Sequence, residues 1–378
     1  MKRSSERILT SHAGSLPRPD EVRAMLVAKH AGESYDKAVF DERVRAAVAA
    51  VVRKQIACGL DVVNDGELSK INFTSYARER LGGVTQRKRE LGQSSFKIWG
   101  RDETEFPEYF AAINLGVDYA VCSGPITYLG QDAVLADIRN LKAALEGVAP
   151  AEAFITAVAP GTIEHWLKNE YYRDEESYLA AIAEAMRQEY RAIVDAGFIL
   201  QIDDPDLGDA WQIHPEMDVP AYRRFAELRI DVLNHALRGI PVERVRFHMC
   251  WGSYHGPHKY DIPLDQIIDL VLKVNAECYS IEASNPRHEH EWRVWEKVKL
   301  PEGKSLMPGV VGHACDFVEH PELAAERLDK YARLVGRSNL IAGTDCGLGT
   351  RVGHPKIAWA KFEAMAEGAR LASRDLWH

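Results

Sequence analysis

The sequence predicts an α/β protein, specifically a (β/α)8 TIM barrel, and three observations support that fold class. Eight short runs of β-branched and apolar residues recur along the 378-residue chain. Each run has Gly, Pro, Asp, Asn or His among its last residues or directly after them, and most runs are followed by a stretch with helical periodicity, as in repeated βαβ units. Reactive side chains gather at the carboxyl ends of these runs, where such barrels place their catalytic groups.

The predicted strands are separated by enough residues for a helix between most of them. They are RILTSHAGS (7–15), LDVVNDGE (60–67), AFITAVAPG (153–161), FILQIDDP (198–205), RVRFHMCWG (244–252), CYSIEAS (278–284), LMPGVVGHA (306–314) and NLIAGTDCG (339–347). Amphipathic helices are predicted over Asp41 to Gly59, Glu175 to Gly197, Pro220 to Gly239, Pro263 to Ala276, Pro321 to Gly336 and Pro355 to Ala372. Several begin near Pro and end at Gly, as helix termini do.

One segment departs from this alternation, and we predict that it is an insertion between the second and third barrel strands. It covers about residues 81–145. Its first half, GGVTQRKRELGQSSFKIWGRDETEFPEY, is polar and lacks helical period, and the strand-like YAVCSGPITYLG follows. Because no repeat, Pro-rich linker or low-complexity tract marks a boundary, residues 1–378 are predicted to form a single barrel domain.

The composition favours a globular protein that binds small molecules. Hydrophobic residues make up 46% and charged residues 27% of the chain, and 47 basic against 56 acidic residues give a net charge of −9. An acidic surface argues against a nucleic-acid or membrane partner. No apolar run is long enough for a membrane span or a secretory signal, so a cytoplasmic location is expected. Whether the chain forms a homo-oligomer stays open.

The cysteines are relevant to chemistry more than to cross-linking. Six of them are scattered over a long chain, unlike the dense spacing of a disulfide-stapled secreted domain. In a reducing compartment, their thiols are free to bind metal or to react. The signatures of dinucleotide, P-loop, serine-hydrolase and zincin sites are missing from the sequence.

A metal site is suggested by His248 and Cys250. They stand two residues apart at the end of a predicted strand, so both side chains project from the same face. The alternative is that Cys250 is a small buried hydrophobe and His248 a hydrogen-bonded core residue. Glu282 and Cys346 add an acid and a thiol at two other strand ends, and such a set suits tetrahedral Zn²⁺. For Glu282, the alternative is a salt bridge to Arg287 or Arg351.

These segments resemble a known family. FHMCWG, YSIEAS and AGTDCGLGTR are similar to the zinc-binding segments of the catalytic barrel of cobalamin-independent methionine synthase. ILTSHAGSLPRP, VVNDGE and QIDDP resemble its substrate-binding segments, so the similarity covers nearly the whole chain. The resemblance implies a small thiol, homocysteine first of all, that is activated on Zn²⁺ as a thiolate and attacks a methyl or other alkyl donor.

The resemblance also implies roles for single residues. The implied zinc ligands are His248, Cys250, Glu282 and Cys346, and the implied substrate-binding residues are Ser15, Glu67, Asp203 and Glu282. Asp203 would grip the substrate amino group, and His313 would serve with it in catalysis, as an acid or base, with His320 as the second candidate.

Each role has a structural alternative. Ser15 is also typical of a turn or helix cap in GSLPRP. Glu67 and Asp203 could form salt bridges, for example to Arg18 or Lys70, and either candidate histidine could cap the helix that starts at HPEL.

The alkyl donor is left open by the sequence. The chain is about as long as one barrel, whereas the full-length synthase has a second, amino-terminal half that helps to bind folate. HMCWGSYHGPHKYDIPL, SNPRHEHEW and GHACDFVEHPEL also resemble single-barrel relatives that include the epoxyalkane:coenzyme M transferases. An epoxide-opening thiol transferase or lyase is therefore the alternative function, and a non-catalytic zinc-binding barrel is the other. The cluster NPRHEHEW could accept an anionic group or be a solvated loop.

Overall fold

Each of the eight predicted runs overlaps one strand of a single parallel sheet in the computed structural model, which describes residues 1–87, 100–113 and 119–377. The strands are β1 (Leu9–Thr10), β2 (Val62–Asn64), β5 (Glu152–Val158), β7 (Ile199–Asp203), β8 (Val245–Met249), β9 (Cys278–Ile281), β10 (Ser305–Val311) and β11 (Ile341–Thr344). Their order in the sheet is β1-β11-β10-β9-β8-β7-β5-β2. The predicted fold class is confirmed.

The sheet curls into a nearly closed barrel, because its two edge strands meet. The Asp61 amide donates to the Thr10 carbonyl over 3.0 Å, and the Ser11 hydroxyl donates to the Val62 carbonyl over 3.2 Å. Every residue of β7, β8 and β10 is buried, as expected for strands that are covered on both faces. This two-sided burial explains why the strands appear in the sequence as apolar runs and not as alternating patterns.

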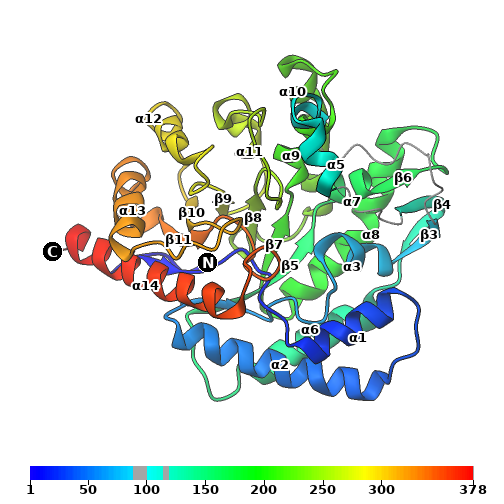
Figure 1. Cartoon of the computed structure of the whole chain (residues 1–378), viewed down its shortest axis with the longest axis horizontal. Helices are drawn as coiled ribbons and strands as arrows, with labels where there is room; N and C mark the ends of the chain where they lie inside the picture. Colours follow the sequence, from blue (N-terminus) through cyan, green and yellow to red (C-terminus); the bar gives the residue numbers. More distant parts are fainter. Residues whose placement is uncertain (88–99, 114–118, 378) are drawn as a thin grey trace.

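Six long helices pack around the strands (Figure 1). They are α2 (Lys37–Ala57), α6 (Gln131–Ala144), α8 (Glu175–Asp195), α10 (Val219–Ala236), α13 (Pro321–Val335) and α14 (Pro355–Trp377). Side-chain caps determine several of their starts, since Asp36, Asp174 and Asp218 each accept a hydrogen bond from a backbone amide of the first turn. Five of these six helices match predicted segments, and α6 lies within the predicted insertion.

The remaining elements are shorter. The helices are α1 (Asp20–His30), α3 (Phe73–Glu79), α4 (Gly100–Glu105), α5 (Pro107–Ile113), α7 (Pro160–Trp166), α9 (Asp206–Ile213), α11 (Ile268–Val271) and α12 (Val294–Lys297). Turns of 3₁₀ helix cover Val242–Arg244, Leu264–Gln266, Glu289–Arg293 and Arg337–Asn339. The predicted helix from Pro263 to Ala276 is wrong as a continuous element. It divides into a 3₁₀ turn and α11, because Ile267 leaves the helical region at φ −133°.

The predicted insertion supplies two of the three strands of a small second sheet, and the third strand comes from residues 167–169, after β5. In this sheet β3 (Leu81–Arg87) runs antiparallel to β4 (Tyr119–Tyr128), and β6 (Leu167–Asn169) runs parallel to β4. Residues 88–99 of the polar stretch lie outside the described part of the chain. At the other end of the segment, α6 packs against α2 and α8, so it takes the position of a barrel helix between β2 and β5.

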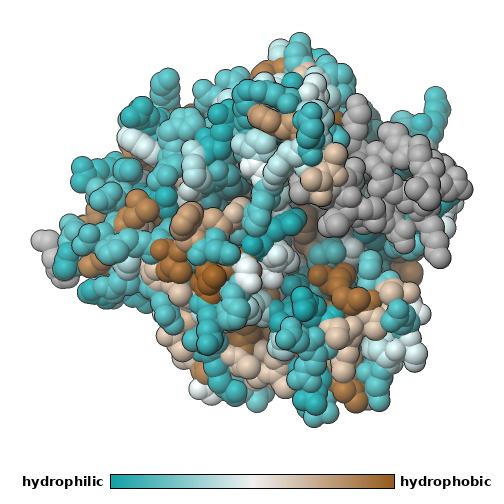
Figure 2. Space-filling model, in the orientation of Figure 1, coloured by the Kyte–Doolittle hydropathy of each residue, from teal (hydrophilic) through white to brown (hydrophobic). Residues whose placement is uncertain are grey.

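The face of the molecule seen in Figure 2 is largely hydrophilic, with apolar residues in small groups. Within the described residues, none of the helices has both the length and the apolar character that a bilayer crossing requires. The large apolar residues form a main core cluster between the strands and the surrounding helices. The barrel therefore provides a rigid support for the ends of its strands.

Candidate metal and substrate site

The predicted site residues lie at the carboxyl ends of seven barrel strands. In chain order they are Ser15 and Glu67 beyond β1 and β2, Asp203 at the end of β7, His248 and Cys250 at the end of β8, Glu282 after β9, His313 after β10, and Cys346 after β11. All of them therefore belong to the face of the barrel at which enzymes of this fold place their active sites.

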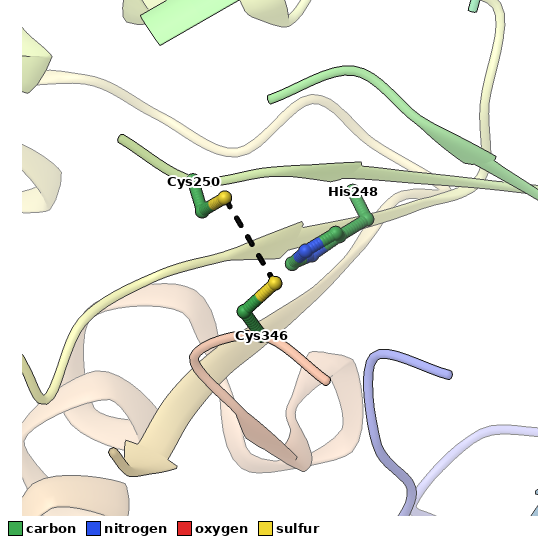
Figure 3. Close-up of side chains that lie close together, drawn as sticks. All are labelled: His248, Cys250 and Cys346. Carbon is green, nitrogen blue, oxygen red and sulfur yellow. Dashed lines mark hydrogen bonds between the residues drawn. The ribbon is translucent and has the colours of Figure 1, made fainter. Parts of the chain in front are cut away.

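His248, Cys250 and Cys346 form one compact group. Their candidate ligand atoms all lie within 4.8 Å of one another, and the two sulfur atoms are 4.0 Å apart (Figure 3). The His248 Nδ1 atom pairs with the Ser280 hydroxyl at 3.1 Å. Its Nε2 atom is buried and has no hydrogen-bond partner among the described residues. A buried, unpaired imidazole nitrogen beside two sulfurs is an arrangement that a metal ion would satisfy.

The sulfur pair has a spacing that suits zinc, and one of its thiols has a lowered pKa. Two thiolates on a tetrahedral zinc ion, each about 2.3 Å from the metal, are about 3.8 Å apart, which is close to the spacing observed here. The hydrogen bond from the Cys250 thiol, with His248 nearby, holds the pKa of Cys346 well below its ordinary value. The same hydrogen bond, together with burial, raises the pKa of Cys250. The lowered pKa favours the thiolate form of Cys346, which is the form that binds metal.

Glu282 is not a member of this group. Its Oε2 atom accepts a hydrogen bond from the Trp251 amide at 3.0 Å, and Oε1 accepts one from Asn285 Nδ2 at 2.9 Å. Neither Arg287 nor Arg351 forms an ion pair with it in the described structure. Instead, its carboxylate belongs to a second group of candidate metal ligands, with His313 and Asp345.

Asp345 is a residue that the sequence analysis missed. Its Oδ1 atom accepts from the backbone amides of Ala283 and Ser284, both at 2.8 Å, and its Oδ2 atom accepts from the Ser284 hydroxyl at 2.6 Å. Asp345 directly precedes Cys346, so these bonds tie the Cys346 segment to the two residues that follow Glu282. The only sequence signal was an acid next to a candidate ligand.

The two candidate histidines differ in their surroundings. His313 is 1% exposed, and neither of its ring nitrogens has a hydrogen-bond partner among the described residues. His320 is exposed and caps α13, because its Nδ1 atom accepts from the Glu322 amide at 3.2 Å. The geometry therefore favours His313 over His320 for a chemical role.

A cavity of about 330 Å³ opens beside the sulfur pair. The predicted site residues that line it are Ser15, Glu67, Asp203, His248, Cys250 and Cys346. Glu282 and His313 do not line it in the described structure. Residues that were not predicted complete the wall, among them Trp166, Asp206, Asp209, Tyr254 and Arg351.

Asp203 is held beside His248. The two residues are register partners on β7 and β8, and Asp203 Oδ1 accepts from Gln201 Nε2 at 2.7 Å. Gln201 is in turn held by Arg246, whose Nε donates to Gln201 Oε1 at 2.6 Å inside the barrel. Burial raises the pKa of Asp203 to about 8, with a further contribution from the nearby Glu67 carboxylate. A cationic group in the cavity would favour its ionised form.

Glu67 has a strained backbone. Its φ is +58°, a left-handed value that residues other than Gly rarely adopt. The Glu67 carboxylate accepts from the Thr156 hydroxyl at 2.9 Å, while the Arg18 guanidinium donates to the Glu67 carbonyl at 3.0 Å and to the Ser15 hydroxyl at 3.5 Å. Arg18 thus holds Glu67 by its main-chain carbonyl and Ser15 by its hydroxyl. It does not pair with the Glu67 carboxylate in the described structure.

Comparison with known proteins identifies the family. Residues 8–106 and 139–370 match the family described as the cobalamin-independent synthase catalytic domain. The chain belongs to this family. The methionine synthase of Saccharolobus solfataricus is 26% identical over 375 residues, which cover 97% of this chain and 95% of the relative. That of Thermococcus kodakarensis is 24% identical over 368 residues, with 97% and 94% covered. The predicted family is confirmed, and with it the general class of methyltransferase.

Solved structures show the same fold. A B12-independent methionine synthase from Shewanella sp. W3-18-1, in complex with selenomethionine, has a TM-score of 0.73 at 21% identity and covers 98% of this chain and 99% of its own. A putative vitamin-B12 independent methionine synthase from Listeria monocytogenes has a TM-score of 0.65 at 18% identity, with 98% and 99% covered.

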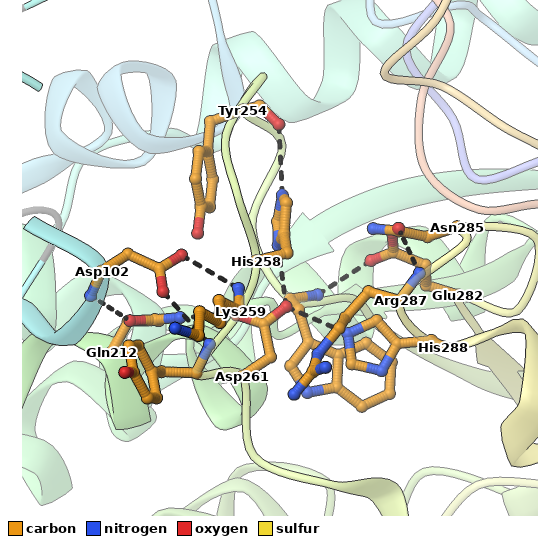
Figure 4. Close-up of polar contacts among 12 residues, drawn as sticks. Asp102, Gln212, Tyr254, His258, Lys259, Asp261, Glu282, Asn285, Arg287 and His288 are labelled. Carbon is orange, nitrogen blue, oxygen red and sulfur yellow. Dashed lines mark hydrogen bonds and ion pairs between the residues drawn. The ribbon is translucent and has the colours of Figure 1, made fainter. Parts of the chain in front are cut away.

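In this member of the family, a buried network of charged groups lies next to the candidate metal ligands (Figure 4). At its centre, Asp261 Oδ2 pairs with His258 Nδ1 at 2.7 Å and with His288 Nε2 at 3.0 Å. The other nitrogen of His288 pairs with Glu291 at 2.9 Å. Burial opposes the charged imidazole, but these hydrogen bonds to two carboxylates outweigh it and raise the pKa of His288 to about 9.

This network contacts the candidate metal ligands through Trp251. The His288 ring is stacked on the Trp251 indole, with centroids 3.7 Å apart. Trp251 follows Cys250 in the chain, and its amide is the donor to Glu282. The sequence analysis placed His288 in the cluster NPRHEHEW, which could accept an anionic group or be a solvated loop. It did not predict the network, since the spacing of one segment cannot show that Asp261 joins His288 to His258.

Proposed function

We propose that this protein is a zinc-dependent methyltransferase that acts on a small amino-acid thiol, with homocysteine as the preferred candidate. The observation that supports this most directly is the group of His248, Cys250 and Cys346 at one cavity that also contains the carboxylates of Glu67 and Asp203. Soft ligands and carboxylates at one cavity match a molecule that has both a sulfur atom and an ammonium group.

The imidazole of His248 and the two sulfurs would hold the zinc ion. Zinc in this position would keep the substrate sulfur deprotonated near neutral pH. Asp203 and Glu67 would receive the substrate ammonium group, and Asp203 would lose its proton as that cation arrives, because burial keeps its pKa near 8 in the empty cavity. Ser15 would face the carboxylate end of the amino acid.

His313 is proposed as the general acid or base. It is buried and unpaired beside Glu282 and Asp345, so it can accept a proton and pass it to a neighbouring carboxylate. Trp166 and Asp209 line the remaining part of the cavity, which we assign to the alkyl donor.

The experiment is a direct assay of the zinc-loaded protein. Homocysteine is offered with methyltetrahydrofolate or another methyl donor, and methionine is measured. We expect one zinc per chain and methionine formation that is lost after chelation and restored by zinc. Full activity in a metal-free preparation would contradict the proposal.

An epoxide-opening thiol transferase or lyase is the second candidate, and the position of Glu282 favours it. The three grouped ligands, His-x-Cys and a distant Cys, have the pattern that the sequence shares with the epoxyalkane:coenzyme M transferases, and Glu282 lies outside that group. A panel of epoxides and methyl donors, tested with the same thiols, separates the two functions. A structural zinc site predicts instead that added thiol leaves the X-ray absorption spectrum of the metal unchanged.

A further inference from the structure

The cavity beside the sulfur pair has an uneven charge. Four of its lining side chains are carboxylic acids, namely Glu67, Asp203, Asp206 and Asp209. Among the described residues that line it, Arg351 is the single arginine, and no lysine is present. An anionic substrate group that enters this cavity would share it with four acidic side chains, and Arg351 is the lining arginine able to offset its charge.

Arg351 is held close to Ser15 by its own loop. A Cβ atom at Gly347 would lie 2.7 Å from Ser15 Cβ, and one at Gly349 would lie 2.6 Å from Ser15 Oγ. Both distances are shorter than real Cβ contacts, so the two glycines allow the backbone after Cys346 to pack directly on Ser15. Ser15 and Arg351 therefore belong to one part of the cavity wall.

The guanidinium of Arg351 is available for a ligand. It forms no hydrogen bond or ion pair with any residue in the described part of the chain, and its side chain is exposed at the cavity. Arg18, the other arginine near Ser15, differs in this respect. Its guanidinium donates to the main-chain carbonyls of Lys70 and Glu67 and to the Ser15 hydroxyl.

We propose that Arg351 binds the carboxylate of the thiol substrate and so selects amino-acid thiols over simple thiols. This inference rests on the proposed function, in which the sulfur lies at His248, Cys250 and Cys346 and the ammonium group at Glu67 and Asp203. The remaining charge of such a molecule is its carboxylate, and a guanidinium can bind both carboxylate oxygens at once. A carboxylate of the alkyl donor has the same chemistry and is the other source of this group.

The test compares three probes on the zinc-loaded full chain by isothermal titration calorimetry. The probes are homocysteine, homocysteamine, which is the same molecule without its carboxylate, and methyltetrahydrofolate. In Arg351→Gln we expect homocysteine to bind roughly tenfold or more weakly, and the affinity for homocysteamine to change by less than about twofold. Arg351→Lys keeps the charge without the forked geometry and should recover part of the affinity. Arg45→Gln, an exposed arginine on the outer helix α2, is the matched control.

Each other outcome contradicts the inference. Equal losses for homocysteine and homocysteamine would mean that Arg351 only supports its loop. An unchanged affinity for homocysteine, with or without weaker binding of methyltetrahydrofolate, would show that the carboxylate of the thiol is not the partner. A wild-type protein that binds neither thiol would overturn the proposed function itself, before any Arg351 variant is considered.

Discussion

The substitution His288→Gln is expected to remove a pH-dependent part of the free energy of unfolding. The His288 side chain is 2% exposed and lies between the carboxylates of Asp261 and Glu291, with His258 and Glu282 nearby. A neutral imidazole has one N–H and cannot donate to both carboxylates, whereas the protonated ring donates to both. The folded protein therefore binds a proton on His288 more tightly than the unfolded chain does.

The size of the effect follows from the pKa. Raising the pKa of His288 from its ordinary 6.5 to about 9 corresponds to about 3 kcal/mol, at about 1.4 kcal/mol for each pKa unit. Because the folded pKa is the higher one, this stabilisation is fully present below about pH 6.5 and is lost as the pH rises through about 9. The advantage of the wild type over the variant in free energy of unfolding should then be about 3 kcal/mol larger at pH 6 than at pH 10.

Urea unfolding of both proteins, stripped of metal and followed by circular dichroism between those two pH values, measures this difference. His290→Gln is the control, since His290 is exposed on the same loop and should leave the pH profile unchanged. The reasoning is refuted if His288→Gln loses stability with rising pH as steeply as the wild type. A resonance of His288 that titrates near pH 6.5 in the wild type would refute it equally well.

Three further predictions concern the site itself. Cys346→Ser should lower bound zinc well below one per chain in metal analysis, whereas Cys122→Ser, a buried thiol on β4, should retain it. Position 67 has a φ of +58°, which Gly adopts without strain. The free energy of unfolding of Glu67→Gly should therefore be about 1 kcal/mol higher than that of Glu67→Ala, although both variants lose the hydrogen bond to Thr156. Asp203→Asn should raise the KM for homocysteine about tenfold or more in steady-state kinetics while zinc content stays constant; an unchanged KM would remove Asp203 from the ammonium site.

The strands of the barrel could be predicted because their signal is local. Each is a short apolar run that is buried on both faces, and the reactive residue at its end is next to it in the sequence. Some predicted runs were longer than the strands, because the reactive residues that follow a strand were included in the run. The run 7–15 contains a strand of two residues, Leu9–Thr10, because the chain then leaves the sheet to form the cavity wall at Ser15.

The rest depends on contacts between distant segments. Asp345 was not predicted, because its role is to bind the backbone after β9, which is about 60 residues earlier in the chain. Nor does the sequence show that the Glu282 carboxylate turns toward Trp251 and Asn285. Four residues of types that suit zinc were visible at the strand ends, but the direction of each side chain is decided by neighbours that the pattern does not contain.

The separation of strand ends from loops also explains where specificity would be set. His248 and Asp203 are register partners within the sheet, so a change in the loops moves them little. Arg351 lies on a loop after β11 that packs closely against Ser15, and Trp251 begins a loop whose indole stacks on His288. Under the proposed function, thiol activation would depend on the rigid strand ends, and the choice of thiol and donor would depend on the loops, which can change while the strands stay in place.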